Sequence, residues 1–578
     1  MTEPNKGNSL LAVDIGTLNT RAAYFDVIEG AYRCIGTGQS PTTSNAPVSN
    51  AMIGVQLAIE NLQNFIGKSL MDVEGHLIIP SQADGLGVDC MVTSFSLGPT
   101  LKALTVGLLS EVSLKSIDKL VQTTYASVAD RFTLNDSRSP SEQVDEILRL
   151  KPDLILIAGG IDGGSTSFIE KMLEIIGLGV FLLPEAERPA VLFAGNNQLQ
   201  EKIRAVLKNV NISPNIRPTL EIEDLAPAQN QLAGIVSTIR QKQMPELDEV
   251  RMLSGGFFEP SSYAQGRMVR FLSSYFGSGQ GVLSIDIGAS NLSMGASFGG
   301  DLHLNVFTQL GLGEPMRDLL SQTTLEEIMR WLSLDIPPET VLAYLYQKSI
   351  LPGFIPATKV ELAIEQAVVR QNLQLATRWM IDRLPANLRS SNGLLPSFEP
   401  ILASGAAITG AANPGQKLML LLDGLQPAGI TTFAIDQNNL LAMLGVAAEV
   451  NSVVPVQALD SGALTYLATV ISPVSDVDYG TPIVRAKLIR DDGTEMSSEI
   501  QMGNLQILPL GARQTARLQL RPLKNADVGL GPGRAGEVDV NGSSIGIVID
   551  ARGRPLRLPP DQVKRRALLQ KWIATLGD

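Results

Sequence analysis

The spacing of apolar and polar residues predicts strands and tight turns at the start of the chain. An apolar stretch at residues 10–14 is followed by a turn at 16–19 and by two more strand-like stretches, 21–27 and 32–36. Residues 48–71 then carry helical spacing. The large apolar residues expected on the buried face of this helix are Ile53, Leu57, Leu62, Phe65 and Ile66.

A second pattern, in which helices alternate with short buried strands, is typical of a parallel α/β sheet. It begins near residue 141, and its strands at 153–158 and 190–194 each run into a glycine. The elements expected just before it are a strand pair, 89–96 and 102–109, and a helix at 114–126. We therefore predict an inserted α/β subdomain.

The pattern of the opening residues returns in the middle of the chain. Residues 281–307 again read as strand, turn and strand, and a mostly helical region follows at 315–384. After Pro455 short strands and turns dominate until a last helix at 561–576. The domains predicted from these changes are a first lobe at 1–140, the inserted subdomain at 141–280, a second lobe at 281–454 and a β-rich domain at 455–578.

The most informative feature is an internal repeat. Residues 11–20, LAVDIGTLNT, recur as residues 283–292, LSIDIGASNL, with Asp, Ile, Gly and Asn at the same offsets. In each copy a strand delivers an aspartate to the end of a sheet, and glycine lets the following turn approach a ligand closely. The amides of such turns bind phosphate oxygens, and carboxylates favour Mg²⁺, which keeps much of its water shell. The alternative interpretation is that the two segments are ordinary hairpin turns that bind no ligand.

Four segments, two of them the copies of the repeat, give the chain a resemblance to the actin–Hsp70–sugar kinase superfamily. Asp14-Ile15-Gly16-Thr17, with Thr20, resembles its first phosphate loop, and Asp286-Ile287-Gly288 resembles the second. Residues 402–407 resemble the adenosine loop, and residues 439–448 resemble the helix that connects the lobes. The resemblance implies an α/β fold with a duplicated actin-like ATPase (ribonuclease H-like) core in two lobes, to which this chain adds an inserted α/β subdomain and a C-terminal β domain.

The repeat and the resemblance together single out the candidate site residues. Asp14 and Asp286 are the expected catalytic residues, and they would hold Mg²⁺ through water. The residues expected to bind ATP are Gly16, Thr17, Asn19, Thr20, Gly288, Ala289, Ser290, Gly405 and Ala406.

The chain is also similar to the glutamate mutase L family, over about residues 10–450. The similarity rests on residues 156–164, 193–196 and 361–367. It implies an ATPase-like accessory protein encoded beside adenosylcobalamin-dependent mutases in some bacteria, and therefore a protein partner.

The second loop departs from its relatives in a way that affects hydrolysis. Relatives continue with hydroxyl and acidic side chains where this chain has Ala289, Ser290, Asn291 and Leu292. Backbone amides still bind phosphate there. We therefore expect ATP binding with slow hydrolysis.

The composition argues against several other classes of protein. A net charge of −12 argues against nucleic-acid binding, and no apolar run reaches the roughly 18 to 20 residues of a membrane span. Two histidines and two cysteines, Cys34 and Cys90, exclude a zinc site of known spacing and a disulfide framework, which favours the cytoplasm.

Several other motifs can be explained either by a function or by ordinary local structure. The glycine-rich run at 159–164 is either an anion site or a tight turn, and the GxGxxG match at 531–536 lacks a following helix. The basic run at 564–566 fits a solvated helix face, and Glu361 and Glu365 fit either a surface helix or a general base.

The preferred function is an ATP-binding accessory or chaperone-like protein whose slow ATP hydrolysis is coupled to partner binding. The partner would be a cobalamin-dependent mutase or an assembly partner, and oligomers are compatible with the fold. The alternatives are a non-catalytic scaffold or filament-forming actin-like protein, and a small-molecule kinase.

Overall fold

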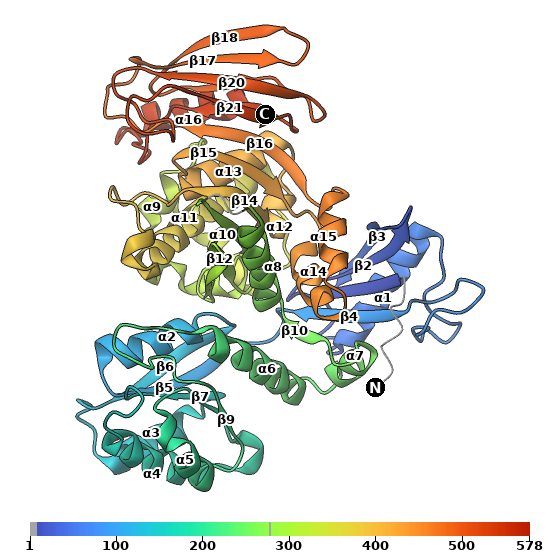
Figure 1. Ribbon diagram of the computed structural model, residues 1–578, viewed down its shortest axis with the longest axis vertical. Coiled ribbons are helices and arrows are strands. Elements are labelled where there is room, and N and C mark those ends of the chain that lie inside the picture. The colour runs from blue at the N-terminus through green and yellow to red at the C-terminus, as the bar shows by residue number, and fades with distance from the viewer. Residues whose placement is uncertain (1–8, 277–278, 578) are drawn as a thin grey trace. The chain divides into compact units, whose positions relative to one another are not determined.

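The computed structural model describes residues 9–276 and 279–577, and these residues divide into two compact units (Figure 1). The first unit comprises the residues up to 24, residues 38–264 and residues 304–308. The second takes 25–37, 265–303 and the chain from 309 onwards. Within the described residues, no helix combines the length and the apolar character that crossing a membrane requires.

The first sheet has the strand order β10-β4-β1-β2-β3. Its central strand β1 is buried at every residue, as expected for a strand covered on both faces. β1 runs parallel to β4, and β4 runs parallel to β10. The strands are β1 (Ser9–Ile15), β2 (Asn19–Ile28), β3 (Ala31–Pro41), β4 (Cys90–Phe95) and β10 (Phe258–Pro260).

The first five strands of the second sheet have the order β13-β12-β11-β14-β15. This is the order of the first sheet read from its opposite edge, β3-β2-β1-β4-β10. β11 pairs antiparallel with β12 and parallel with β14, and β14 runs parallel to β15. The strands are β11 (Gly281–Ile287), β12 (Leu292–Phe298), β13 (Asp301–Phe307), β14 (Phe398–Ser404) and β15 (Gly429–Ile435). This repeated order confirms the predicted duplicated actin-like core.

A third sheet, β6-β5-β7-β8-β9, is entirely parallel and forms the inserted α/β part (Figure 1). Alternate residues of its strands face two different helical layers: Ile155 packs with α3 and α4, whereas Leu156 packs with α2 and α6. Its strands are β5 (Leu101–Gly107), β6 (Ala126–Thr133), β7 (Leu154–Ala158), β8 (Ala190–Phe193) and β9 (Val210–Ile212). Its helices are α2 (Lys115–Val121), α3 (Pro140–Leu150), α4 (Ser167–Leu182), α5 (Gln200–Val206) and α6 (Ala226–Gln243).

Two predictions near this sheet were wrong. The strands expected at 89–96 and 102–109 both exist, but they do not pair with each other, because β4 joins the first sheet and β5 joins the third. The helix expected to reach residue 126 ends at Val121, and the next residues form the strand β6. β6 lies at an edge of the sheet and exposes several polar side chains, so it lacks the apolar run of a buried strand.

The predicted buried face of the first helix was wrong for most of its residues. Helix α1 (Ala51–Ile66) exposes Ile53, Leu57 and Phe65, whereas Leu62 is buried as predicted. Its other buried residues include Ala51, Met52, Val55, Ala58 and Ile59. Small residues explain which face of the helix is buried. A Cβ on Gly54 would lie 2.9 Å from the Pro41 carbonyl oxygen, and a Cβ on Gly38 would overlap Ala58. The helix therefore approaches β3 through its small residues.

Helices separate β13 from β14, as the sequence predicts, and other helices lie between α6 and β10 and after β10, β14, β15 and β22. The first group is α9 (Leu325–Met329), α10 (Pro338–Ile350) and α11 (Lys359–Arg383). The others are α7 (Leu247–Leu253), α8 (Ser261–Phe276), α12 (Ala406–Thr409), α13 (Pro414–Leu425), α14 (Leu440–Val450), α15 (Val453–Asp460) and α16 (Gln562–Leu576).

Three strands of the C-terminal segment continue the second sheet beyond β15. β16 pairs antiparallel with β15 and parallel with β22, and β19 follows β22. They are β16 (Thr465–Ser472), β19 (Leu505–Leu508) and β22 (Gly546–Asp550). The predicted domain boundaries, including the one at residue 455, stay predictions.

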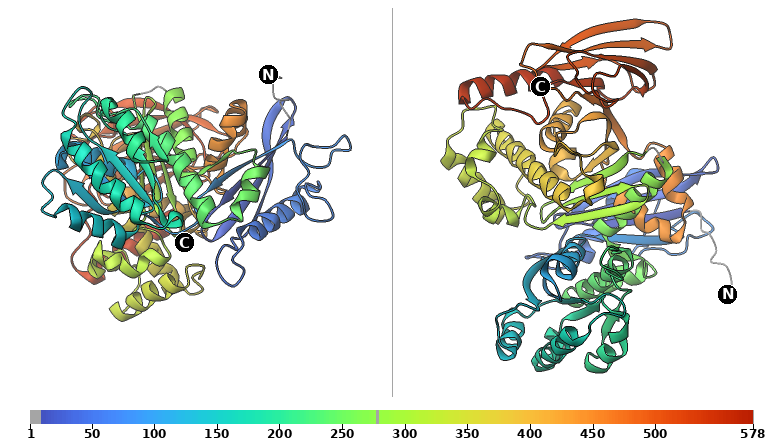
Figure 2. Two further views of the ribbon diagram at one scale, coloured as in Figure 1. Left: turned by 90° about the horizontal axis from the view of Figure 1, so that it is seen from below. Right: turned by 60° about the vertical axis from the view of Figure 1, so that its left-hand side comes forward.

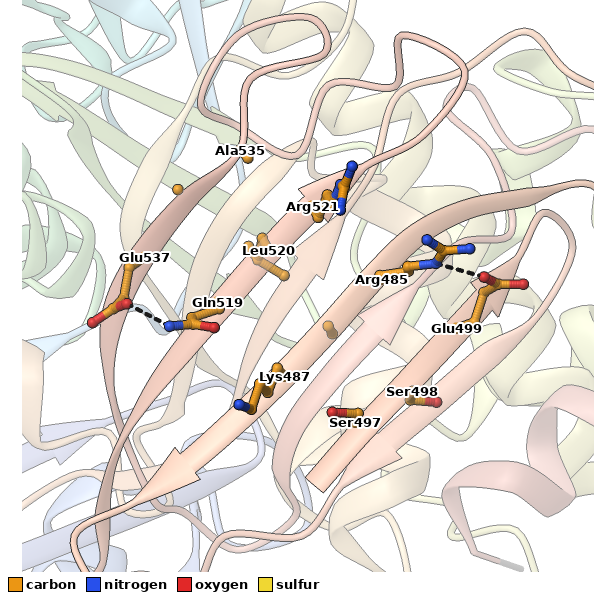
Figure 3. Close-up of a pocket in the computed structure, with 12 residues that line it drawn as sticks. Arg485, Lys487, Ser497, Ser498, Glu499, Gln519, Leu520, Arg521, Ala535 and Glu537 are labelled. Atoms are coloured by element: carbon orange, nitrogen blue, oxygen red, sulfur yellow. Dashed lines mark hydrogen bonds and ion pairs between the residues drawn. The ribbon is translucent and has the colours of Figure 1, made fainter. Parts of the chain in front are cut away.

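The other C-terminal strands form a separate antiparallel sheet, β18-β17-β20-β21 (Figure 2). One face buries apolar residues such as Leu488 and Leu518, and the outer face is polar. On that outer face Arg485 pairs with Glu499, and the Gln519 amide donates to Glu537 (Figure 3). The strands are β17 (Pro482–Arg490), β18 (Glu495–Gln501), β20 (Thr515–Pro522) and β21 (Gly536–Asn541).

A buried cluster of charges joins the C-terminal segment to the second sheet's helices. Asp423 on α13 accepts from Arg370 of α11 at 2.7 Å and from Arg552 at 2.7 Å. Asp550, the last residue of β22, pairs with Arg552 at 2.8 Å and with Arg554 at 2.6 Å. The Arg552 guanidinium also stacks on Trp572 of α16, 4.9 Å from the ring centroid.

The electrostatics of this cluster favour ionised carboxylates. Burial by itself raises the pKa of Asp550, but the Arg552 and Arg554 guanidiniums outweigh it and hold that pKa well below its ordinary range. Because the pKa is lowered on folding, the ionised group stabilises the fold above about pH 4, and this contribution is lost as the pH falls further toward the folded-state pKa.

We expect Asp423→Asn to destabilise the protein by about 3–5 kcal/mol, because it leaves two buried guanidiniums without that carboxylate. Asp476→Asn is the control, since Asp476 pairs with Arg557 at 3.5 Å on an exposed surface, and it should change stability by less than about 1 kcal/mol. Urea unfolding followed by circular dichroism measures both. Equal stabilities of the two variants would show that the cluster contributes little.

Candidate functional site

The first phosphate-loop candidate lies at the end of β1, where Asp14 is buried. Its Oδ1 accepts a hydrogen bond from the Ser94 hydroxyl of β4 at 2.6 Å and from the Ser261 hydroxyl of α8 at 2.7 Å. Its Oδ2 faces Arg21 of β2, whose Nη1 lies 3.9 Å away. One carboxylate oxygen is thus fixed by two hydroxyls, and the other lies next to a cation.

The turn after Asp14 is closed by backbone contacts. The Gly16 amide donates to the Asn19 carbonyl at 3.0 Å, and a Cβ on Gly16 would lie 2.8 Å from that same oxygen. The Thr42 hydroxyl donates to the Gly16 carbonyl at 2.9 Å and lies 2.9 Å from the Thr20 hydroxyl. Thr20 is fully buried in this support, whereas Thr17 and Asn19 are half-buried.

The second copy closes its turn in the same way. The Gly288 amide donates to the Asn291 carbonyl at 2.9 Å. Asp286, Gly288, Ala289 and Ser290 are half-buried. Two backbone hydrogen bonds from the segment after β13 stabilise the loop. The Leu312 amide donates to the Gly288 carbonyl at 3.0 Å, and the Gly313 amide donates to the Ala289 carbonyl at 2.8 Å.

The repeat extends to the neighbouring strands. Asp14 is opposite Ser94 in the β1–β4 register, and Asp286 is opposite Ser404 in the β11–β14 register. The two serines differ in their bonds, because the Ser404 hydroxyl donates to the Ile285 carbonyl at 3.3 Å. The duplicated fold thus places a hydroxyl beside each aspartate.

The adenosine-loop candidate packs directly on the second copy. Gly405 follows β14 with a φ of +97°, and a Cβ there would overlap the Ile287 carbonyl. Ala406 is exposed and begins α12. The second unit therefore brings Gly405 and Ala406 next to the Asp286 strand, while Asp14 and its loop belong to the first unit.

A family model described as "MutL protein" matches residues 10–462 of the chain. The chain belongs to the MutL family. A curated relative, "Protein MutL" of Clostridium tetanomorphum, is 22% identical over 321 residues, which are 53% of this chain and 62% of the relative. This MutL family member thus spans about three fifths of that relative's length.

Solved structures with a similar chain path include two reactivating proteins and a kinase. A diol dehydratase-reactivating factor in nucleotide-free form is 10% identical, covers 79% of this chain and 100% of its own, and has a TM-score of 0.28. A glycerol dehydratase reactivase is 10% identical, with 77% and 100% coverage and a TM-score of 0.31. A ligand-bound xylulose kinase from Lactobacillus acidophilus is 10% identical, with 80% and 93% coverage and a TM-score of 0.31. These values are too low to transfer a role.

Sequence reasoning missed four residues around the loops of this MutL family member. Ser94, Ser261 and Arg21 surround Asp14, as described above. The fourth is Asp436, which follows β15 fully buried and accepts from the Leu440 and Leu441 amides at 2.8 Å each. Only Asp436 had a sequence signal, since an acidic residue just before an apolar helix is typical of a helix start.

The two glutamates considered as a general base have structural contacts. Glu361 completes a capping box with Thr358 at the start of α11. Glu365 pairs with Lys348 at 2.8 Å and accepts from the Tyr344 hydroxyl at 2.6 Å. Burial and the neighbouring Glu365 raise the pKa of Tyr344. These contacts account for both glutamates without a catalytic role.

The cysteines have no thiolate character. Burial raises the pKa of Cys34 to about 11 against the opposing Gly36 hydrogen bond, and Asp436 adds to the rise. Burial and Asp89 raise the pKa of Cys90 to about 11. Both thiols therefore stay protonated at neutral pH. Over the described residues, no three His, Cys, Asp or Glu side chains gather as a metal-ion site.

We expect Gly405→Ala to weaken the fold around the second loop, because the added Cβ would overlap the Ile287 backbone in a left-handed conformation. Gly393→Ala is the matched control, since Gly393 also has a positive φ, +72°, but has nothing within 4 Å of a Cβ. Thermal unfolding of both variants gives the comparison. The close packing is unimportant if the two melting temperatures fall equally.

Proposed function

We propose that the protein is an ATP-binding accessory protein in which both aspartate loops bind one nucleotide. The observation that carries this proposal is that the aspartate, the turn and the strand pairing of the first loop recur in the second. Each copy has an aspartate at a strand end, a glycine amide bonded to an asparagine carbonyl three residues later, and a serine opposite the aspartate. Turns of this kind bind phosphate through their amides.

The carboxylates fit a magnesium ion in their chemistry. Mg²⁺ prefers oxygen ligands and retains several waters, so it needs only one or two carboxylates beside the phosphates. Asp14 and Asp286 would hold it through water. The Ser94 and Ser261 hydroxyls donate to Oδ1 of Asp14 and would keep this carboxylate oriented. Bound Mg²⁺ would neutralise phosphate charge.

The remaining residues would position the nucleotide. The loop residues Gly16, Thr17, Asn19 and Thr20, and Gly288, Ala289 and Ser290 in the other copy, would support or contact phosphate oxygens. Gly405 and Ala406 would face adenosine, since a glycine without Cβ lets a flat ring approach the backbone. Arg21 adds a cation next to the first loop.

The role proposed for ATP is to regulate the binding of a protein partner. Membership of the MutL family and the resemblance to glutamate mutase L support a cobalamin-dependent mutase as that partner. Affinity capture of the purified protein with a mutase, with and without Mg-ATP, tests this role. Capture that does not respond to the nucleotide would contradict it, and nucleotide-dependent pelleting of the protein alone would favour a filament-forming scaffold.

We expect Asp14→Asn and Asp286→Asn each to weaken Mg-ATP binding by about tenfold or more, and to weaken metal-free ATP binding less, because the carboxylate acts on the ion. Asp301→Asn, at an exposed position at the start of β13, is the control and should bind normally. Calorimetric titration distinguishes the cases. Unchanged Mg-ATP affinity in both loop variants would rule out a shared site.

We also expect slow turnover, at or below roughly 1 s⁻¹, the low end of enzyme rates. The second loop has Ala289 and Leu292 where hydroxyl or acidic groups would orient water, and one missing donor costs on the order of 10²-fold in rate. Steady-state phosphate release from the purified protein measures this rate. Turnover of tens per second that Asp14→Asn abolishes would show that the altered loop is no handicap.

A further inference from the structure

Helix α10, in the second unit (Figure 1), has a row of exposed apolar side chains along its outer side. Leu342, Tyr346 and Ile350 follow one another at intervals of four residues, so they lie on one side of the helix. The segment after the helix adds Leu351 and Ile355. These five side chains, between 41% and 80% exposed, are called the α10 stripe below.

The opposite side of α10 is already packed against the rest of the unit. It buries Val341, Tyr344 and Leu345. A surface helix normally carries charged and polar residues opposite its buried face. Helix α3 follows this rule, since it exposes Asp145 and Arg149. Helix α10 has large apolar residues on both sides, which is expected of a helix whose outer side also contacts a partner.

The α10 stripe has charges of opposite sign at its two ends. Glu339 lies in the first turn of α10, about 17 Å along the helix from Ile350. Lys359 begins α11, and the ion pair of Lys348 with Glu365, at 2.8 Å, holds the start of α11 beside the last turns of α10. Among the described residues, neither Glu339 nor Lys359 takes part in an ion pair. One end of the stripe is therefore acidic, and the other end is basic.

We propose that the α10 stripe is the interface of a homodimer, in which two copies of this chain pack antiparallel about a two-fold axis near Tyr346. In a two-fold interface the same surface is used by both copies, so that surface has to be complementary to itself. Antiparallel packing places Glu339 of each copy beside Lys359 of the other. The charges at the two ends thus fit a second copy of this chain.

The size of the stripe also fits a dimer. Five partly exposed side chains that each present on the order of 100 Å² give about 500 Å² of apolar surface per chain. A standard interface buries about 800 Å² on each partner, of which roughly 60% is apolar. The stripe therefore supplies the apolar part of a standard interface, and Glu339 and Lys359 belong to its polar rim.

Sedimentation velocity of the full chain, without nucleotide, tests the proposal. We expect a dimer of the 61.8 kDa chain at micromolar concentration. Tyr346→Glu should raise the dissociation constant by about 100-fold, because it brings two carboxylates together at the axis. The matched control is Phe181→Glu on α4 of the first unit, where the Phe181 side chain is 73% exposed and Tyr346 is 63% exposed. This control should leave the dimer intact.

Exchanging the end charges tests the antiparallel arrangement. Glu339→Lys and Lys359→Glu should each weaken self-association by about tenfold, because each variant alone places like charges side by side. An equimolar mixture of the two variants should dimerise as strongly as the unsubstituted chain, since every end contact then joins opposite charges. The measurements are made at low ionic strength, where rim charges are least screened.

Three results would overturn the proposal. One is a chain that stays monomeric at tens of micromolar, which would leave the stripe to a different protein. Another is a dimer that Tyr346→Glu does not dissociate. The third is a mixture of the two charge variants that associates no more strongly than either variant alone. Because Glu339, Tyr346 and Lys359 belong to neither aspartate loop, a failed ATP site and a failed dimer interface give different outcomes.

Discussion

The ion pairs around Asp423 and Asp550 are the interaction on which the second unit depends. They connect two helices, α11 and α13, to the end of β22 and to the residues that follow it. Because charges buried without partners are costly, these elements have to assemble together. The extension of the sheet by β16, β22 and β19 is therefore part of the core of this unit, and the polar outer sheet is built on top of it.

The duplicated sheets explain why the two candidate aspartates lie where they do. The two central strands are mostly apolar, and each has an aspartate next to its last residue. The neighbouring parallel strand reaches the same edge with a serine. Duplication thus repeats the local surroundings as well as the motif, although Asp14 is more deeply buried than Asp286.

The sequence was sufficient for features that depend on local pattern and on repetition. The repeated strand and turn at Asp14 and Asp286 predicted two sheets of one topology. It was insufficient where partners are distant: Ser261 bonds to Asp14 across 247 residues, and no local pattern contains that contact. The prediction for helix α1 failed for another reason, because its buried face includes the small residues Ala51, Gly54 and Ala58, which the spacing of large apolar residues does not reveal.

The hydrogen bond from Ser261 to Asp14 has a mechanical consequence. Ser261 is the first residue of α8, and α8 runs without a break from the first unit into the second, since the division falls after Ala264. Asp14 therefore holds the origin of a helix whose far end belongs to the other half of the protein. Any event that alters how Asp14 shares its oxygens therefore acts on the first residue of this helix.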